Sequence, residues 1–337
     1  MLSYVIVGSG YRSMYFARVA ATYPSLFRAI YLCRSEEKAA LMTARTGLQA
    51  TTSLEEVKRF SPDFAVIAVD RGHIADVAEE WVLRGYPVVT ETPVGSSEEQ
   101  LARLISLGEK GAKIVCCEQY HRQPLLAAGL REIQRGTIGT PSSLYISLLH
   151  DYHAASLIRR YLLIAPETEY SIQGFSMRSP VAETDSRGGA FWDGRQTTAE
   201  RSLMLVSFAT GQQAVYDFSP IQYRSYIRSR HLTVRGELGE WSDTQLLYLD
   251  AQHCPRRKAL TPEPEERYRC LDTQAMRDRR RNWTTELAPD TVQDEFAIAS
   301  ILLDMGDYLD GGESPYPLAE AIADARFWLR LQQAAAK

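Results

Sequence analysis

The feature that most constrains the fold is the alternation of short apolar runs with amphipathic segments over the first 120 residues. An apolar run at residues 2–7 ends at Gly8, and an amphipathic helix is predicted from Met14 to Tyr23. Strand-like and helix-like segments then alternate up to a strand at residues 113–117. Because parallel strands need crossover connections, which helices supply, this pattern predicts an α/β fold. We expect a Rossmann-type, doubly wound parallel sheet in residues 1–120.

The pattern changes after a helix predicted at residues 124–135. Strand-like runs separated by turns follow, at residues 142–149, 170–177, 202–210, 213–219 and 229–236. These runs predict an α+β domain with a large, mostly antiparallel sheet over residues 121–337, which would bind substrate and mediate oligomerisation. Helices at residues 292–310 and 318–333 are expected to cover one face of that sheet. A total of 337 residues agrees with two domains.

Composition excludes several classes of partner. The chain has 38 Lys and Arg against 42 Asp and Glu, so its net charge of −4 offers no general attraction for nucleic acid or an anionic membrane. A small-molecule substrate is therefore the expected partner. The five cysteines form no C-x-x-C pair and no zinc-type spacing with histidine, so no metal site is predicted. No secretory signal and no long apolar run is evident, which predicts a cytoplasmic protein.

A glycine-rich turn joins the first strand to the first helix, with the sequence Gly8-Ser9-Gly10-Tyr11-Arg12. The first glycine permits a tight turn, and the second lets the backbone approach a pyrophosphate. The N-terminus of the following helix offers unpaired N–H groups to the negative charge. The turn therefore predicts a dinucleotide site, although the next residue is serine where the fingerprint has glycine or alanine.

The second predicted strand ends at Cys33-Arg34-Ser35. An acidic residue at this place would accept the 2′-hydroxyl of NAD, whereas a cation and a hydroxyl suit the 2′-phosphate of NADP. Arg34 and Ser35 therefore favour NADP, with NAD possible. The alternative is that Arg34 is a solvated surface residue.

Further motifs occur in a fixed order: Asp70-Arg71-Gly72-His73, residues 85–93, residues 136–139, residues 234–239 and the pair Glu295-Phe296. In order and spacing the chain resembles the Gfo/Idh/MocA oxidoreductases, the family of glucose-fructose oxidoreductase and inositol dehydrogenase. The resemblance implies NAD or NADP in the N-terminal half and oxidation of a secondary alcohol of a sugar or cyclitol, or the reverse reduction. It also places Asp70, His73 and Glu91-Thr92-Pro93 beside the cofactor.

The chain departs from the family at two signatures. The family's Glu-Lys-Pro triplet is Glu91-Thr92-Pro93 here, and threonine supplies a hydrogen bond but no charge. In the second signature His153 matches the family histidine, whereas the flanking aspartates are replaced by Leu149 and Ser156. The usual chemistry is therefore not carried over unmodified.

Two imidazoles, a carboxylate and a phenol lie together at His150-Asp151-Tyr152-His153. We expect His153 to donate or accept a proton, because an unperturbed histidine titrates near pH 6.5, and Asp151 to fix its tautomer. Tyr152 and Thr92 complete the candidate catalytic residues. The alternative is that these residues only cap the next helix and pair with each other.

Four residues are candidates for contact with substrate: Tyr120, Arg122, His150 and Trp192. The first two follow the fifth long strand, where a hinge to the second domain is expected, and ordinary hinge packing is the alternative. Trp192 lies in an aromatic, glycine-rich segment, residues 188–195, that would close over substrate or form a simple exposed turn.

These features lead to one main hypothesis and two alternatives. The main hypothesis is an NADP-preferring oxidoreductase acting on a small polar hydroxyl or carbonyl compound. One alternative is a catalytically silent or regulatory dinucleotide-binding protein of the same fold. The other is a reductase for an imine or an unusual carbonyl, for which the lysine is dispensable. By analogy with the family, the antiparallel sheet would join copies into a homodimer or homotetramer.

Overall fold

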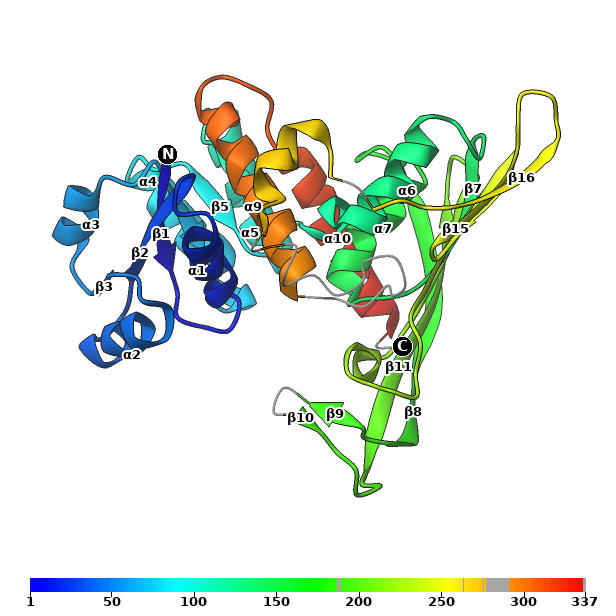
Figure 1. The fold of residues 1–337 in the computed structure, drawn as a ribbon, viewed down its shortest axis with the longest axis horizontal. Helices are drawn as coiled ribbons and strands as arrows, with labels where there is room; N and C mark the ends of the chain where they lie inside the picture. The colour runs from blue at the N-terminus through cyan, green and yellow to red at the C-terminus, as the bar shows by residue number, and fades with distance from the viewer. Residues whose placement is uncertain (187–188, 263, 275, 277–290, 336–337) are drawn as a thin grey trace. The chain divides into compact units, whose positions relative to one another are not determined.

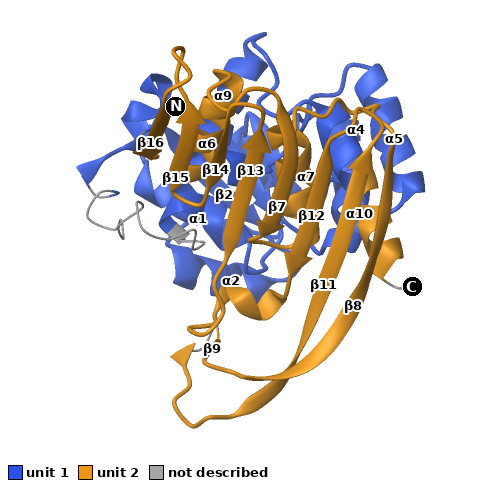
Figure 2. Ribbon diagram, turned by 90° about the vertical axis from the view of Figure 1, so that its right-hand side faces the viewer, with its two compact units in different colours: residues 1–123, 264–280, 291–325 blue, residues 124–263, 281–290, 326–337 orange. Residues whose placement is uncertain are grey.

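The computed structural model describes residues 1–337 except 187–188, 263, 275, 277–290 and 336–337. The described chain divides into two compact units (Figure 2). Unit 1 holds the described residues of 1–123, 264–280 and 291–325, and unit 2 those of 124–263 and 326–337. Segments near the C-terminus therefore belong to the same unit as the N-terminus.

Unit 1 contains a six-stranded parallel sheet (Figure 1). Its strands are β1 (Leu2–Val7), β2 (Phe27–Leu32), β3 (Ala50–Thr51), β4 (Phe64–Ile67), β5 (Val88–Thr90) and β6 (Ile114–Cys116). Their order is β3-β2-β1-β4-β5-β6, with every pair parallel. This is the Rossmann order, which confirms the predicted doubly wound sheet.

Helices follow these strands as predicted. They are α1 (Ser13–Thr22), α2 (Glu36–Thr46), α3 (Leu54–Phe60), α4 (Ile74–Leu83) and α5 (Glu98–Glu109), with short 3₁₀ helices η1 (Arg71–His73), η2 (Tyr120–Arg122) and η4 (Glu266–Leu271). Three of them begin after a serine, Ser35, Ser53 or Ser97, whose hydroxyl accepts a backbone N–H of the first turn. Serine therefore determines where these helices start.

The late helix α9 (Thr291–Leu309) corrects one expectation. It was predicted to cover the antiparallel sheet, but it packs against α1 within unit 1. Most of its residues are buried, including Phe296, Ile298 and Leu302. A helix that is buried on nearly all sides has no single apolar stripe from which its partner could be inferred.

Unit 2 contains an eight-stranded sheet. The strands are β7 (Pro141–Ser147), β8 (Tyr170–Ala182), β11 (Gln196–Phe208), β12 (Gln213–Phe218), β13 (His231–Gly236), β14 (Gly239–Ser242), β15 (Gln245–Leu249) and β16 (Pro255–Ala259). The order is β16-β15-β14-β13-β7-β12-β11-β8, and only β7 and β12 run parallel. The predicted, mostly antiparallel sheet is confirmed. The sequence did not indicate the last three strands, each of which is only four or five residues long.

One face of this sheet forms the core of unit 2. Helices α6 (Pro124–Gln134) and α7 (Asp151–Tyr161) pack on it, and so does the C-terminal part of α10 (Leu318–Ala335). Trp241 is fully buried between Tyr161 and Gly129; a side chain at Gly129 would collide with its ring, at 2.2 Å. The close approach of α6 therefore requires glycine there.

The hairpin of β8 and β11 is longer than its neighbour. β12 pairs only with residues 202–207 of β11, whereas β8 pairs with β11 from Gln196 to Phe208. Figure 2 shows the two strands continuing past the end of β12, with the small hairpin of β9 (Asp185–Ser186) and β10 (Gly189–Ala190) at their far end. The two strands therefore form an arm that extends beyond the rest of the sheet.

Candidate active site

The glycine turn follows β1, where the strand order changes direction: β2 and β3 lie on one side of β1, and β4, β5 and β6 lie on the other. Open α/β sheets bind ligands at such a switch point. Gly8 has a φ of +121°, and a side chain there would lie 2.2 Å from the carbonyl oxygen of Ala68. Gly10, by contrast, has no atom within 4 Å of the place where a side chain would begin. The turn is thus closed against the sheet at Gly8 and open at Gly10, as a pyrophosphate requires.

Ser13, at the departure from the fingerprint, is bonded to the turn itself. Its hydroxyl donates to the carbonyl oxygen of Gly10 at 2.7 Å, and the hydroxyl of Tyr31 on β2 donates to the carbonyl oxygen of Ser13 at 3.0 Å. These bonds fasten the start of α1 to the turn and to β2. A serine therefore fits at this position without widening the contact between helix and strand.

Arg12, a candidate for contact with the cofactor, pairs with two carboxylates. Its Nε lies 3.0 Å from Oε1 of Glu91 and its Nη1 lies 3.2 Å from Oδ2 of Asp294 on α9. Asp294 also accepts from the amide of Gln123 at 2.9 Å. Burial opposes the charge on Arg12, but the two carboxylates outweigh it and raise the pKa of the guanidinium. Arg12 is therefore a permanent cation that ties the turn to the Glu91 loop and α9.

A second ion pair lies beside the first. Nε of Arg18 is 2.6 Å from Oε1 of Glu295, which is fully buried, and the ring of Tyr15 lies under the guanidinium groups of both Arg12 and Arg18. The sequence motif Glu295-Phe296 does not indicate Arg18 as the partner of Glu295. No local signal connects residues that are so far apart in the chain.

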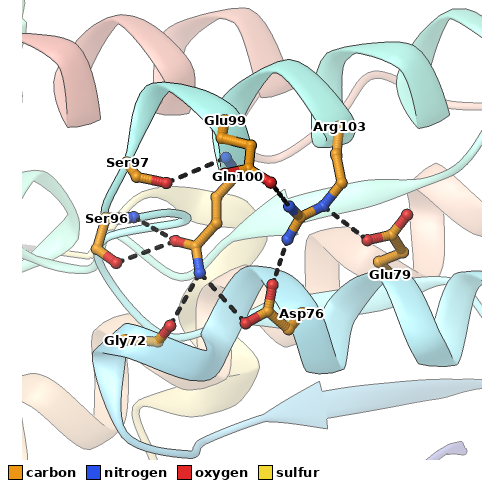
Figure 3. A network of polar contacts seen from close by, with 8 residues as sticks. All are labelled: Gly72, Asp76, Glu79, Ser96, Ser97, Glu99, Gln100 and Arg103. Carbon is orange, nitrogen blue, oxygen red and sulfur yellow. Dashed lines mark hydrogen bonds and ion pairs between the residues drawn. The ribbon is translucent and has the colours of Figure 1, made fainter.

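Gln100 joins the loops that follow β4 and β5 (Figure 3). Its amide nitrogen donates to the carbonyl oxygen of Gly72 at 2.9 Å, and its amide oxygen accepts from the backbone N–H of Ser96 at 2.9 Å. Arg103, one turn further along α5, pairs with Asp76, Glu79 and Glu99. The Asp70–His73 loop and the Glu91–Pro93 loop are thus held against one helix.

Within these loops the predicted residues differ in exposure. Asp70 and His73 are exposed, and Oδ1 of Asp70 accepts the backbone N–H of Gly72 at 3.0 Å. Glu91 is 5% exposed and held by Arg12, whereas Thr92 is half-buried and followed by a cis peptide bond to Pro93. The triplet thus presents threonine rather than a charged side chain.

At the end of β2, Arg34 is exposed and Ser35 caps α2, with its hydroxyl accepting the N–H of Lys38 at 3.3 Å. Arg34 remains a candidate for the 2′-phosphate. Ser35 already has a structural role, which leaves its hydroxyl hydrogen as the group available for donation.

Arg122, a candidate for contact with substrate, has several partners within unit 1. Its Nη1 is 2.5 Å from Oδ2 of Asp304 and also bonds to the hydroxyl of Tyr268, and its Nη2 donates to the carbonyl oxygen of Pro315 at 2.9 Å. Its neighbour Tyr120 is 7% exposed. These partners give Arg122 a structural role within unit 1, joining η2 to α9 and η4.

In unit 2 the segment His150-Asp151-Tyr152-His153 forms the beginning of α7. The backbone N–H of His150 donates to the hydroxyl of Tyr223 at 2.9 Å, and their rings are 4.8 Å apart. The ring of Tyr152 lies between those of His150 and His153, at 5.6 Å and 4.4 Å. His150, Tyr152 and His153 thus form one cluster of rings, to which Tyr223 adds a member that the sequence did not indicate.

Asp151 and Trp192 each have partners within unit 2. The carboxylate of Asp151 accepts from the backbone N–H of Tyr152 at 3.0 Å and bonds to the amide of Gln332 on α10. Trp192 is 85% exposed and stacks on Tyr226, with 5.9 Å between ring centres. Gly188, at the start of its segment, lies outside the described residues.

No group of three His, Cys, Asp or Glu side chains among the described residues is placed to hold a metal ion. None of the helices in the described part of the chain has the length and apolar character needed to span a membrane.

Residues 2–119 match the model of the family GFO_IDH_MocA, described as an oxidoreductase family with an NAD-binding Rossmann fold. The match confirms the resemblance inferred from the sequence motifs. Over residues 2–119 the chain is therefore similar to the NAD-binding domain of this oxidoreductase family. No curated protein matches the chain.

Solved structures share the fold over the whole length. An NAD-binding oxidoreductase from Klebsiella pneumoniae has 15% identity and a TM-score of 0.72, with 99% of this chain and 97% of that one covered. A levoglucosan dehydrogenase in complex with NADH and levoglucosan has 15% identity, a TM-score of 0.69 and the same coverage. An oxidoreductase from Sinorhizobium meliloti has 18% identity and a TM-score of 0.67, covering 99% and 97%. At these identities the similarity establishes the fold alone.

Proposed function

We propose that this protein is an NADP-preferring oxidoreductase that acts on a small polar hydroxyl or carbonyl compound, sugar-like or polyol-like. The observation that carries the proposal is the glycine turn, closed at Gly8 and open at Gly10 where β1 and β4 diverge. The matched family and the NADH complex of the levoglucosan dehydrogenase support a nicotinamide cofactor.

The residues of unit 1 fit such a cofactor. The open backbone at Ser9 and Gly10 and the N-terminus of α1 would hold the pyrophosphate, and exposed Arg34 would contact the 2′-phosphate. Asp70, His73 and the triplet from Glu91 to Pro93 would lie along the nicotinamide end. The nicotinamide, when bound, supplies or accepts the hydride.

Proton transfer is assigned to His153 in this proposal. Its imidazole can exchange a proton near neutral pH, whereas the hydroxyl of Thr92 has too high a pKa to do so. Tyr152, in ring contact with both histidines, would hold the imidazole in place, and Asp151 fastens the first turn of α7. Thr92 would donate a hydrogen bond to the reacting oxygen.

Turnover tests the enzymatic part of the proposal. A panel of polyols, sugars and keto acids is assayed by nicotinamide absorbance with the wild type and with His153→Ala. We expect the variant to lose about 10²- to 10⁴-fold in kcat, the usual contribution of a general acid or base, while its affinity for NADPH stays unchanged. Full activity of His153→Ala would remove the assignment of the proton to this residue.

The uncharged Thr92 favours a second candidate, a catalytically silent dinucleotide-binding protein of the same fold. Saturable binding of NADPH without turnover of any substrate would support it. If Thr92→Lys then gains dehydrogenase activity, the missing cation is the reason for the silence. A reductase for imines would instead turn over cyclic imines with wild-type Thr92.

Cofactor preference has its own test. Arg34→Asp should lower the affinity for NADPH about tenfold relative to NADH, because it removes one charge-assisted contact and adds a repelling carboxylate. Arg45→Asp on the neighbouring helix α2 is a control of equal charge change. An unchanged ratio of the two affinities would refute the ribose argument.

We further propose that copies of the chain associate through the outer face of the large sheet, as a homodimer or homotetramer. The strand register aligns Thr233, Tyr145, Val215 and Leu205 in one row on that face. Exposed Phe175, Met177 and Leu247 extend this row with further apolar side chains, and contiguous exposed apolar side chains are typical of interaction surfaces. Light scattering of Leu205→Glu should show a smaller species than the wild type if the proposal holds.

A further inference from the structure

Three loops leave the same edge of the large sheet as the start of α7. Because β7 and β12 are parallel, Ser147 and Phe218 end at one edge, and β13 begins there with His231 paired to Ser147. The arm of β8 and β11 extends past that edge. The connections at residues 148–151 and 219–230, and the described residues 183–186 and 189–195, therefore belong to one end of unit 2.

Ring contacts and a hydrogen bond join these connections to one another. Tyr223 contacts His150, and the guanidinium of Arg230 lies 5.7 Å from the centre of the Tyr223 ring. Three residues after Tyr223, the backbone N–H of Tyr226 donates to Oγ1 of Thr184 at 2.9 Å, and its ring stacks on Trp192. The loop at residues 219–230 thus connects His150 with the aromatic pair on the arm.

The charge of this loop has one sign. Residues 219–230 contain Arg224, Arg228 and Arg230 and no acidic residue. On the facing connection Asp193 is held by Arg195 at 2.6 Å, while Glu183 and Asp185 carry the remaining negative charge. Guanidinium groups bind carboxylates and phosphates in bidentate fashion, and a flat indole packs on the face of a ring.

Resting on the proposed function, we propose that this loop and the Trp192–Tyr226 pair form a subsite for the oxyanion of a substrate that carries a carboxylate or phosphate on a sugar ring. Arg224 and Arg228 bind the oxyanion. The exposed face of Trp192 packs against the ring or group attached to it. His150, through Tyr223, connects this subsite with the cluster that contains His153.

Equilibrium binding tests the subsite without any turnover. Calorimetry on the full chain compares glucose with glucuronate, glucose 6-phosphate and UDP-glucose; the last three separate carboxylate, sugar phosphate and nucleotide as sources of the oxyanion. We expect at least one anionic probe to bind about tenfold or more tightly than glucose, since each charge-assisted contact contributes on that scale. Added salt should lower the affinity for the anionic probe more than the affinity for glucose, because salt screens charge interactions.

Variants locate the effect. Arg224→Gln with Arg228→Gln should lower affinity for the anionic probe about tenfold and leave that for glucose unchanged. Trp192→Ala should lower the affinity for the same probe but not the affinity for inorganic phosphate, which has no ring to pack against the indole. Arg257→Gln, an exposed residue of β16 on the same sheet, is the control and should bind as the wild type does.

Each outcome decides between the proposals. Equal affinity for glucose and all anionic probes, or an arginine double variant that binds like the control, overturns the subsite. NADPH binding and turnover of neutral polyols in that case leave the proposed function standing. Anionic probes bound through the arginines by a protein that binds no dinucleotide would keep the subsite and refute the oxidoreductase.

Discussion

The glycine turn of unit 1 and the start of α7 in unit 2 place their chemistry in different ways. In the turn the important atoms belong to the backbone, and their positions follow from the conformations of Gly8 and Gly10. At α7 they belong to side chains, and His150 is bonded to Tyr223, which lies 73 residues away along the chain. A local motif therefore predicts the first site, whereas the second depends on contacts that only the fold creates.

Substitution of the two glycines gives the largest expected effect. Gly8→Ala puts a methyl group against the carbonyl oxygen of Ala68 at a positive φ, and neither backbone can move away, so we expect a loss of about 3 kcal/mol in stability. The methyl group of Gly10→Ala would enter open space, so this variant should keep its stability but bind NADPH more weakly. Urea unfolding and NADPH titration of both variants measure this contrast. Equal stabilities would contradict the closed and open description of the turn.

Arg12→Met tests the ion pairs that tie the turn to its surroundings. The substitution leaves Glu91 and Asp294, each 5% exposed, without their cation. We expect the free energy of unfolding to fall by about 3 kcal/mol, the lower end of the range for a buried pair, because Arg12 is partly exposed. Arg84→Met, which breaks a surface pair with Glu80, is the control and should cost below about 0.5 kcal/mol. Urea unfolding measures both variants, and similar losses would mean that the buried position of the carboxylates does not matter.

The sequence predicts well what depends on neighbours in the chain. The alternation of strands and helices, the serine caps and the glycine turn all follow from short segments, and the structure has them. The ion pairs of Arg12 and Arg122, by contrast, cannot be predicted from short segments. Their partners, Asp294 and Asp304, lie on α9, which returns to unit 1 from far along the chain. No pattern within a short segment indicates such a return.

Tyr223→Phe tests the long-range construction of the second site. It removes the oxygen that accepts the His150 N–H, and we expect a loss of about 1 kcal/mol in stability together with a lower kcat. The affinity for NADPH should not change, because Tyr223 belongs to unit 2. Tyr248→Phe on β15 is the control. A variant with unchanged kcat would show that the position of His150 does not depend on this bond.

The smallest effect is expected at a third place, the outer face of the large sheet, where side chains interact without a motif or a cluster of rings. Asp217 is bound there by Nε and Nη2 of Arg201, each at 2.5 Å, and by the hydroxyl of Tyr145 at 2.9 Å. Burial would raise the pKa of Asp217, but these bonds outweigh it and lower the pKa below its ordinary value.

A depressed pKa of Asp217 in the folded state contributes stability that is present above the unfolded pKa, about 3.9, and is lost as the pH falls through the folded value. Because Arg201 is half exposed, Asp217→Asn should cost below about 1 kcal/mol at pH 7 and less at pH 3, where the wild type loses the same interaction. Urea unfolding at the two pH values measures the difference, and a cost that is larger at pH 3 than at pH 7 would reverse the sign argued here.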